Sequence, residues 1–178
     1  MHHVGKILLT TGLAALLVLA GCSDDHRVPS APQPTAVASA VPNADAQAVE
    51  SVADGIIASW ASFDDDVDKF LDVSQKVTRR KNLSAADRQK LTELFAAMRA
   101  SLTRAGDITV PAINDAELKQ NVMRAVEANK KWAQAEQSRL AAIAKGDTTH
   151  AQKFVEYAEA HVLEAATALG LAYKSAGM

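Results

Sequence analysis

Mostly apolar residues recur at alternating steps of four and three along residues 49–77. They are Val49, Ala53, Ile56, Trp60, Phe63, Val67, Phe70, Ser74 and Val77. Such steps return to one face of an α-helix, because two helical turns take about seven residues. The spacing therefore predicts one long helix from Asp45 to about Lys81, with Asp45 as its N-cap. A helix with a single apolar seam needs other helices to cover that seam.

The composition also favours an all-helical fold. Alanine supplies 36 of the 178 residues, whereas there are only 8 glycines and 5 prolines. Alanine is the strongest helix former, and a turn-rich β-sandwich would need a different mixture. Aromatic residues make up 4% of the chain, so large rings cannot be the main material of the core.

Charge and cysteine content exclude several classes of function. The formal net charge is −2, so no strongly basic face is required and nucleic acid is not an expected partner. The single cysteine excludes an intrachain disulfide, a multi-cysteine zinc site and a cysteine-ligated iron–sulfur cluster.

A second helix is expected to begin at Ser84 and to stop at Gly106. Ser84 and Asp87 have the spacing of a capping box, with aspartate in place of the usual glutamate. The apolar face of this helix consists of Leu91, Leu94, Phe95, Met98 and Leu102. Residues 107–114 contain Pro111, which predicts an extended connection.

Two further helices complete the pattern. One is expected from about Asp115 to Lys145 with Gly146 as its stop, and its buried residues would be Leu118, Val122, Val126, Ala133, Leu140 and Ile143. The other is expected to begin at Thr148 or Thr149, with a seam of Phe154, Ala158, His161, Ala165, Ala168 and Ala172. Short links make neighbouring helices antiparallel. The expected fold is an all-α, antiparallel, up-down four-helix bundle.

The N-terminal residues have the pattern of a secretory signal. Lys6 and the amino terminus form a positive region, and residues 7–20 are apolar but shorter than the about 20 residues that span a bilayer. The stretch ends in a motif that resembles the lipobox of bacterial lipoproteins, namely Leu19, Ala20, Gly21 and Cys22. The resemblance implies cleavage before Cys22 and acylation of its sulfur and new amino group, with chains such as palmitate. Several acyl chains together give stable membrane anchoring.

The residues after the motif indicate to which membrane the lipoprotein is sorted. Ser23 at this position resembles an outer-membrane sorting signal facing the periplasm, and inner-membrane retention is the alternative because Asp24 and Asp25 follow. Residues 23–44 contain four of the five prolines, which predicts an extended tether. The expected organisation is a signal peptide at 1–21, a lipidated tether at 22–44 and a helical domain at 45–178.

Five aspartates gather on the first predicted helix: Asp64, Asp65, Asp66, Asp68 and Asp72. A cation site is conceivable, but Asp65 and Asp72 each lie four residues before a lysine, which is the spacing of helix-surface ion pairs. The spacing and glycine of a calcium loop are absent from the sequence. A solvated face is therefore the favoured interpretation.

Four other residues are candidates for a role in binding or in the core. His161 falls on an apolar seam between Tyr157 and Glu164, and a hydrogen-bonded histidine is favoured over a ligand because the partners of a di-iron or haem site are missing. Trp60 and Trp132 would fill the core or line a ligand pocket. Asn129 is expected to be a buried polar residue that fixes helix register.

The sequence contains no nucleophilic-serine motif, phosphate loop or recognisable pair of catalytic carboxylates. We therefore expect no catalytic residues, no cofactor and no metal site. The favoured function is a non-enzymatic, lipid-anchored periplasmic protein-binding module, such as an accessory subunit of an envelope complex. The alternatives are a toxin-neutralising immunity or inhibitor lipoprotein, and a small-ligand or metal-binding bundle that uses the interior around His161.

Overall fold

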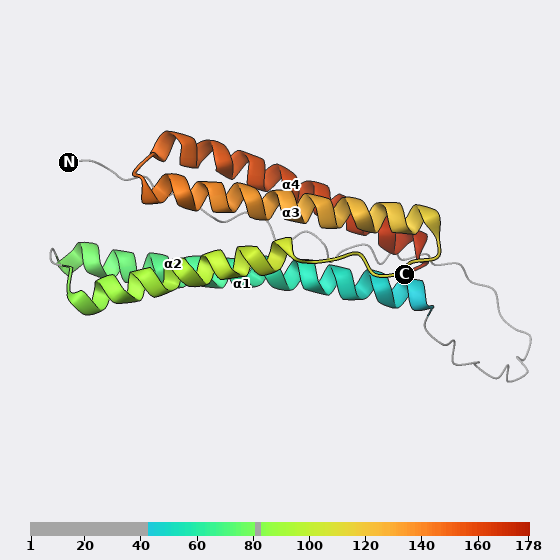
Figure 1. Ribbon diagram of the computed structural model, residues 1–178, viewed down its shortest axis with the longest axis horizontal. Coiled ribbons are helices and arrows are strands. Elements are labelled where there is room, and N and C mark those ends of the chain that lie inside the picture. The colour runs from blue at the N-terminus through green and yellow to red at the C-terminus, as the bar shows by residue number, and fades with distance from the viewer. Residues whose placement is uncertain (1–42, 81–82) are drawn as a thin grey trace, which may run out of the picture. The chain divides into compact units, whose positions relative to one another are not determined.

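The computed structural model describes residues 43–80 and 83–178. The predicted signal peptide, the lipobox and nearly all of the predicted tether lie outside the described residues. Within them the chain forms four helices, α1 (Ala44–Arg80), α2 (Ala85–Gly106), α3 (Ala116–Ala144) and α4 (Thr148–Ser175). Neighbouring helices run antiparallel (Figure 1), so the predicted all-α four-helix bundle is confirmed.

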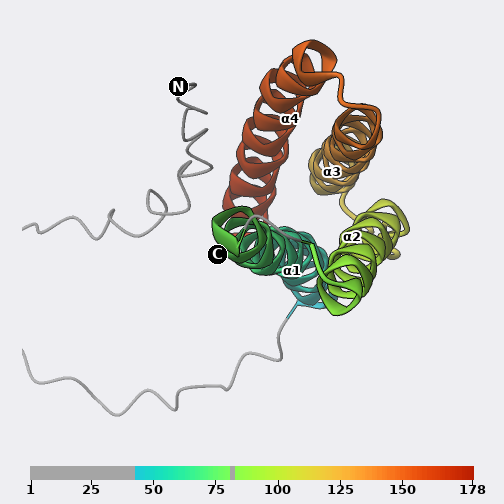
Figure 2. The same cartoon turned by 90° about the vertical axis from the view of Figure 1, so that its left-hand side faces the viewer.

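The bundle consists of two helical hairpins. We call α1 and α2 the first hairpin, and α3 and α4 the second. Helices α3 and α4 contact each other extensively, whereas α1 makes few contacts with either of them. Figure 1 shows the hairpins closer together where the connection joins them than at the end that holds both hairpin turns. Figure 2, viewed from the turn end, places α1 beside α4 and α2 beside α3 around the bundle axis.

The heptad seam of α1 supplies the centre of the core. Six consecutive seam positions are buried: Val49, Ala53, Ile56, Trp60, Phe63 and Val67. They pack against Met98 and Leu102 of α2, Leu118 and Val122 of α3, and a row of alanines on α4. Because alanine side chains are short, α4 can lie close to its neighbours. The predicted seam is thus confirmed over its first two thirds.

The extended connection after α2 closes one end of the core. Residues 107–115 contain no helix, as Pro111 predicts, and Asp107 caps the C-terminus of α2. Ile113 is buried, and Ile108 and Val110 pack against the core cluster. The second short link turns at Gly146, whose φ of 74° suits glycine.

Two local predictions are wrong. Asp45 is not the N-cap of α1: the helix begins at Ala44, and the Asn43 carboxamide oxygen accepts the Asp45 backbone N–H at 3.1 Å. Ile143, expected in the core, is 44% exposed because it lies in the last turn of α3, where the hairpins have diverged. On the predicted seams of the second hairpin, Val126, Phe154 and His161 are only half-buried.

Asp45 instead fastens the connection to the start of α1. Its buried carboxylate accepts the backbone N–H groups of Asn114 and Asp115 at 3.1 Å each, and the Asn114 side-chain amide at 3.3 Å. These hydrogen bonds, the two from the backbone first, hold the pKa of Asp45 below its ordinary value of 3.8. One carboxylate thereby joins the N-terminal ends of α1 and α3.

The lowered pKa of Asp45 predicts a pH-dependent contribution to stability. The contribution is fully present above pH 3.8 and is lost as the pH falls through the lower pKa of the folded chain. An Asp45→Asn chain should therefore lose less stability than the unchanged chain on acidification below that value. Denaturant midpoints measured as a function of pH test this, with the exposed Asp54→Asn as control. Equal acid sensitivity of Asp45→Asn and the unchanged chain would contradict it.

The predicted capping box of α2 is confirmed. Ser84 Oγ accepts the Asp87 backbone N–H at 3.0 Å, and Asp87 Oδ2 accepts the Ser84 backbone N–H at 3.2 Å. Each residue thus satisfies a backbone donor that the first helical turn leaves without a partner.

Removal of this cap should destabilise the chain modestly. Ser84→Ala is expected to lower the free energy of unfolding by about 1 kcal/mol, because the Asp87 N–H loses its acceptor. Ser84→Thr retains a hydroxyl and should cost less. Chemical denaturation of both variants measures the difference, and equal losses would show that the hydroxyl does not matter.

Candidate functional site

The apolar seam of α1 loses its cover toward the hairpin turns. Phe70 and Val77 are half-buried, in contrast to the six buried positions that precede them. On α2, Leu91 and Phe95 are half-buried beside them. The Phe70 and Phe95 rings lie 6.2 Å apart between centroids. We call Phe70, Val77, Leu91 and Phe95 the open seam.

Polar and apolar neighbours frame the open seam. The Arg99 guanidinium lies over the Phe95 ring at 5.4 Å from its centroid. Leu71 and Leu83 are 40% and 39% exposed at the same end of the first hairpin. This end therefore combines two aromatic rings with exposed aliphatic side chains, which is the chemistry of a protein-contact surface.

Buried charges lie near the point where the covered seam ends. Glu136 and Arg139 of α3 are 5% and 7% exposed, and Arg139 Nε donates to Glu136 Oε2 at 2.5 Å. Glu136 follows Trp132 by one helical turn, and the Trp132 ring packs edge-on against Phe63 of α1 at 5.7 Å. The ion pair therefore belongs to the interior and not to the solvated surface.

Acidic side chains from both hairpins act on this pair. Asp64 of α1 and Glu159 of α4 both add to the negative potential at Glu136. We call Asp64, Glu136, Arg139 and Glu159 the charged layer. It contains three carboxyl groups and one guanidinium, so negative charge exceeds positive charge when all four groups are ionised.

The environment of the charged layer raises two pKa values. Burial is the main cause of the raised pKa of Glu136, and Arg139 opposes it. Burial and the nearby Asp68 raise the pKa of Asp64, and Arg139 again opposes the change. Both carboxyl groups therefore hold protons at a higher pH than free side chains do.

Sequence analysis did not find the charged layer. Glu136 and Arg139 are three residues apart, which on a helix is also the spacing of ordinary surface pairs. Only their position after Ala133 and beside Leu140, both predicted to be buried, marks them as interior residues.

The aspartate cluster divides into different environments. The predicted ion pairs Asp65–Lys69 and Asp72–Lys76 are confirmed, and both are exposed. Asp64, however, belongs to the charged layer, and Asp66 accepts a hydrogen bond from α2. Asp64 is nevertheless exposed, as a solvated face predicts, so that prediction is wrong only for the half-buried Asp66.

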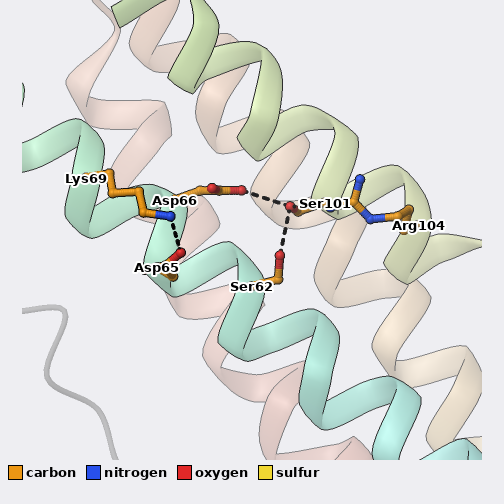
Figure 3. A network of polar contacts seen from close by, with 6 residues as sticks. All are labelled: Ser62, Asp65, Asp66, Lys69, Ser101 and Arg104. Carbon is orange, nitrogen blue, oxygen red and sulfur yellow. Dashed lines mark hydrogen bonds and ion pairs between the residues drawn. The ribbon is translucent and has the colours of Figure 1, made fainter. Parts of the chain in front are cut away.

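The hydrogen bond to Asp66 belongs to a polar network between α1 and α2 (Figure 3). Ser101, only 1% exposed, donates to Asp66 Oδ2 at 2.9 Å and accepts from Arg104 Nη2 at 2.9 Å. Ser62 Oγ lies 3.3 Å from Ser101 Oγ. Because Ser101 has already given its only proton to Asp66, Ser62 must be the donor. The network fixes the register of the first hairpin.

A shallow recess of about 200 Å³ lies beside this network. Gly55, Ala58 and Ile108 form apolar walls, and Ser62 and Arg104 contribute polar groups. The remaining guanidinium N–H groups and the hydroxyl lone pairs could hold one small polar group of a contacting molecule.

His161 lies in a different recess, between α3 and α4. It is half-buried, and its Nδ1 lies 3.1 Å from Glu164 Oε2. Lys131, Ser138 and Tyr157 are among the residues that line the recess, which measures about 250 Å³. In the part of the chain that the structure describes, no three His, Cys, Asp or Glu side chains are placed to hold a metal ion.

The two tryptophans meet in the core. Their rings pack edge-to-face with centroids 6.2 Å apart, and both residues are buried. Asn129 is fully buried, as predicted, and its amide donates to the Ala105 backbone oxygen at 2.8 Å. This bond links α3 to the last turn of α2, which fits the predicted role in helix register.

Comparison with known proteins identifies no relative. No family model, curated protein or solved structure matches this chain. None of the helices in residues 43–80 and 83–178 is both long enough and apolar enough to cross a membrane.

Proposed function

We propose that this chain is a non-enzymatic protein-binding module of the bacterial envelope. Acyl chains on Cys22 hold it to the outer membrane, and the tether carries the bundle into the periplasm. The open seam is its contact surface, and an accessory role in an envelope complex is the activity that this arrangement would serve.

The observation that carries the proposal is the change in cover along a single seam. The same heptad spacing runs through Phe63, Phe70 and Val77, yet only the first of these is buried. Apolar side chains at heptad positions that the chain's own helices do not bury are suited to association with another chain.

The heptad spacing also indicates which kind of partner would bind the open seam. Apolar side chains at heptad positions of one helix are what the side chains of a second amphipathic helix pack between. We therefore propose that the partner presents a helix with an apolar stripe.

Site-specific photo-crosslinking in cells tests the contact surface. A photoreactive phenylalanine analogue at Phe70 should give a discrete adduct heavier than the chain itself, which mass spectrometry identifies. The same analogue at Gln75, an exposed position of α1, is the matched control. Equal labelling at both positions, or none at Phe70, would contradict the proposal.

The anchor has its own test. Cys22→Ser should remove incorporation of labelled fatty acid and release the protein from the membrane fraction, because the sulfur that takes the lipid is gone. A Ser23→Ala chain serves as control and should remain acylated. A Cys22→Ser chain that still incorporates fatty acid and stays in the membrane pellet would exclude Cys22 as the lipid site.

The two alternative functions give different results in the same experiments. An immunity or inhibitor lipoprotein would give an adduct whose added mass is that of a toxin. A small-ligand or metal carrier at His161 would show bound metal or an absorption band in the purified protein.

A further inference from the structure

We propose that the recess between α1 and α2 binds a primary carboxamide, the group that ends an asparagine or glutamine side chain. The recess measures about 200 Å³, and its lining includes Gly55, Ser59, Ser62, Arg104 and Ile108. These α1 residues precede the open seam along the helix, so the recess is a second site of the first hairpin. The proposal does not depend on the proposed function.

The hydroxyl protons of the recess are all given to acceptors of the chain itself. Ser59 Oγ donates to the Ile56 backbone oxygen at 2.7 Å. Ser101 donates to Asp66, so Ser62 Oγ donates to Ser101 Oγ, 3.3 Å away. Ser59 and Ser62 therefore offer only lone pairs, and each can accept a hydrogen bond from a ligand but cannot donate one.

Arg104 supplies the opposite kind of group. Its Nη2 donates to Ser101 Oγ at 2.9 Å, and this is the only hydrogen bond of its side chain among the described residues. A guanidinium carries five N–H groups, so the others remain for an acceptor that enters the recess. The residue is half-buried, which partly shields these groups from water.

This combination selects a ligand with two donors and one acceptor. Ser59 and Ser62 lie three residues apart and so share one face of α1. The two N–H groups of a carboxamide can donate to these hydroxyls while its oxygen accepts from Arg104. A carboxylate has no N–H and would set its charge against both sets of lone pairs. An alcohol has one O–H donor and could satisfy only one of them.

The charges behind the recess also favour a neutral ligand. Ser101 lies between Asp66 and Arg104 and is hydrogen-bonded to both (Figure 3). Their opposite charges offset one another, so a neutral carboxamide leaves the network balanced. A bound carboxylate would add a negative charge that has no cation of its own in this half-buried place, which is unfavourable.

Gly55 supports a ligand site independently of these hydrogen bonds. Glycine weakens the interior of a helix in comparison with alanine. A Cβ at this position would contact Ile108 Cδ1 at 3.7 Å, which is an ordinary van der Waals distance. The packing of the chain therefore does not require glycine here. What glycine provides is additional room in the wall of the recess.

Titration with acetamide, followed by nuclear magnetic resonance, tests the site. The full chain is isotope-labelled and purified in a mild detergent, and the backbone amide signals of Gly55 and Ile108 are observed. We expect saturable shifts of both signals with a dissociation constant in the millimolar range, because so small a probe makes few contacts. Acetate has the same shape without N–H groups and should bind about tenfold more weakly, as should N,N-dimethylacetamide, which can only accept.

Substitutions assign the binding to these residues. Arg104→Met and Ser62→Ala should each weaken acetamide binding about tenfold, because each removes one of its hydrogen-bond partners. Arg88→Met, the same change at an exposed position of α2, should bind acetamide as the parent does. Gly55→Ala should stabilise α1 and yet weaken binding, so its loss of binding cannot be attributed to unfolding.

Two further compounds separate the possible sources of the carboxamide. N-acetylglutamine N-methylamide presents the group as a protein does, whereas free glutamine adds the charged ends of an amino acid. Tighter binding of the capped compound assigns the recess to an asparagine or glutamine side chain of a partner protein. Tighter binding of free glutamine assigns it to a free amino acid, and both results support a carboxamide site.

Three results would overturn the proposal. They are the absence of saturable shifts with acetamide, equal binding of acetate and acetamide, and unchanged acetamide binding in both Arg104→Met and Gly55→Ala. Failure of photo-crosslinking at Phe70 would overturn the proposed contact surface and leave this titration unaffected.

Discussion

Trp60→Ala is expected to lower the free energy of unfolding by about 3–5 kcal/mol, as large-to-small changes in a core do. Trp60 is 7% exposed, and its ring packs edge-on against Trp132. The buried positions of α4 are alanines apart from Leu169, so α4 offers few large side chains to fill the resulting cavity. The loss is a large part of the about 5–15 kcal/mol expected for a domain of this size.

Chemical denaturation of the unchanged chain and of Trp60→Ala measures this loss. Trp60→Phe is the matched control and should cost less, because it keeps a ring at the contact with Trp132. The indole Nε1 of Trp60 is buried without a hydrogen-bond partner among the described residues, so its removal forfeits no such bond. An unchanged midpoint in Trp60→Ala together with loss of partner capture would contradict the core packing of the indole and favour a partner-binding role.

Arg139→Met is expected to cost about 3–5 kcal/mol near neutral pH, the range measured when one partner of a buried ion pair is removed. The substitution leaves the Glu136 carboxylate buried beside Asp64 and Glu159 with no cation to balance it. The cost should shrink as the pH falls, because a protonated Glu136 no longer needs a cation. The cost of Asp45→Asn also falls at low pH, but for a different reason, because the carboxylate of Asp45 then loses its own hydrogen bonds.

A double variant separates the charge from the packing. Glu136→Leu combined with Arg139→Met replaces the pair by apolar side chains and should recover most of the stability. Thermal or chemical unfolding of the two single variants and the double variant forms the required cycle. If the double variant is as unstable as Arg139→Met alone, the pair contributes through its shape and not through its charges.

The heptad steps on α1 let the sequence predict the fold class and the buried residues of α1 from Val49 to Val67. Burial from Val49 to Val67 depends only on which side of one helix a residue occupies, and periodicity reports that directly. The capping box at Ser84 and the extended connection at 107–114 were predictable for a similar reason. Each depends on contacts or dihedral angles within a few residues of the chain.

Interactions between distant residues could not be predicted in this way. Asp45 was expected to cap its own helix, but it accepts the backbone N–H groups of Asn114 and Asp115, about seventy residues further along. Ile143 has the spacing of a core residue and is exposed because the second hairpin diverges from the first at that level. Neither outcome has a local signal in the sequence.

The sequence alone determined that four amphipathic helices form and which face each would bury, because helix formation and amphipathicity are local properties. Only the tertiary structure decided how much of each helix's apolar face the other helices cover. It therefore separates Val67, which is packed, from Val77, which is open, although the two belong to one seam. It likewise places Glu136 and Arg139 inside the bundle, because the environment of a charge depends on the other helices that surround it.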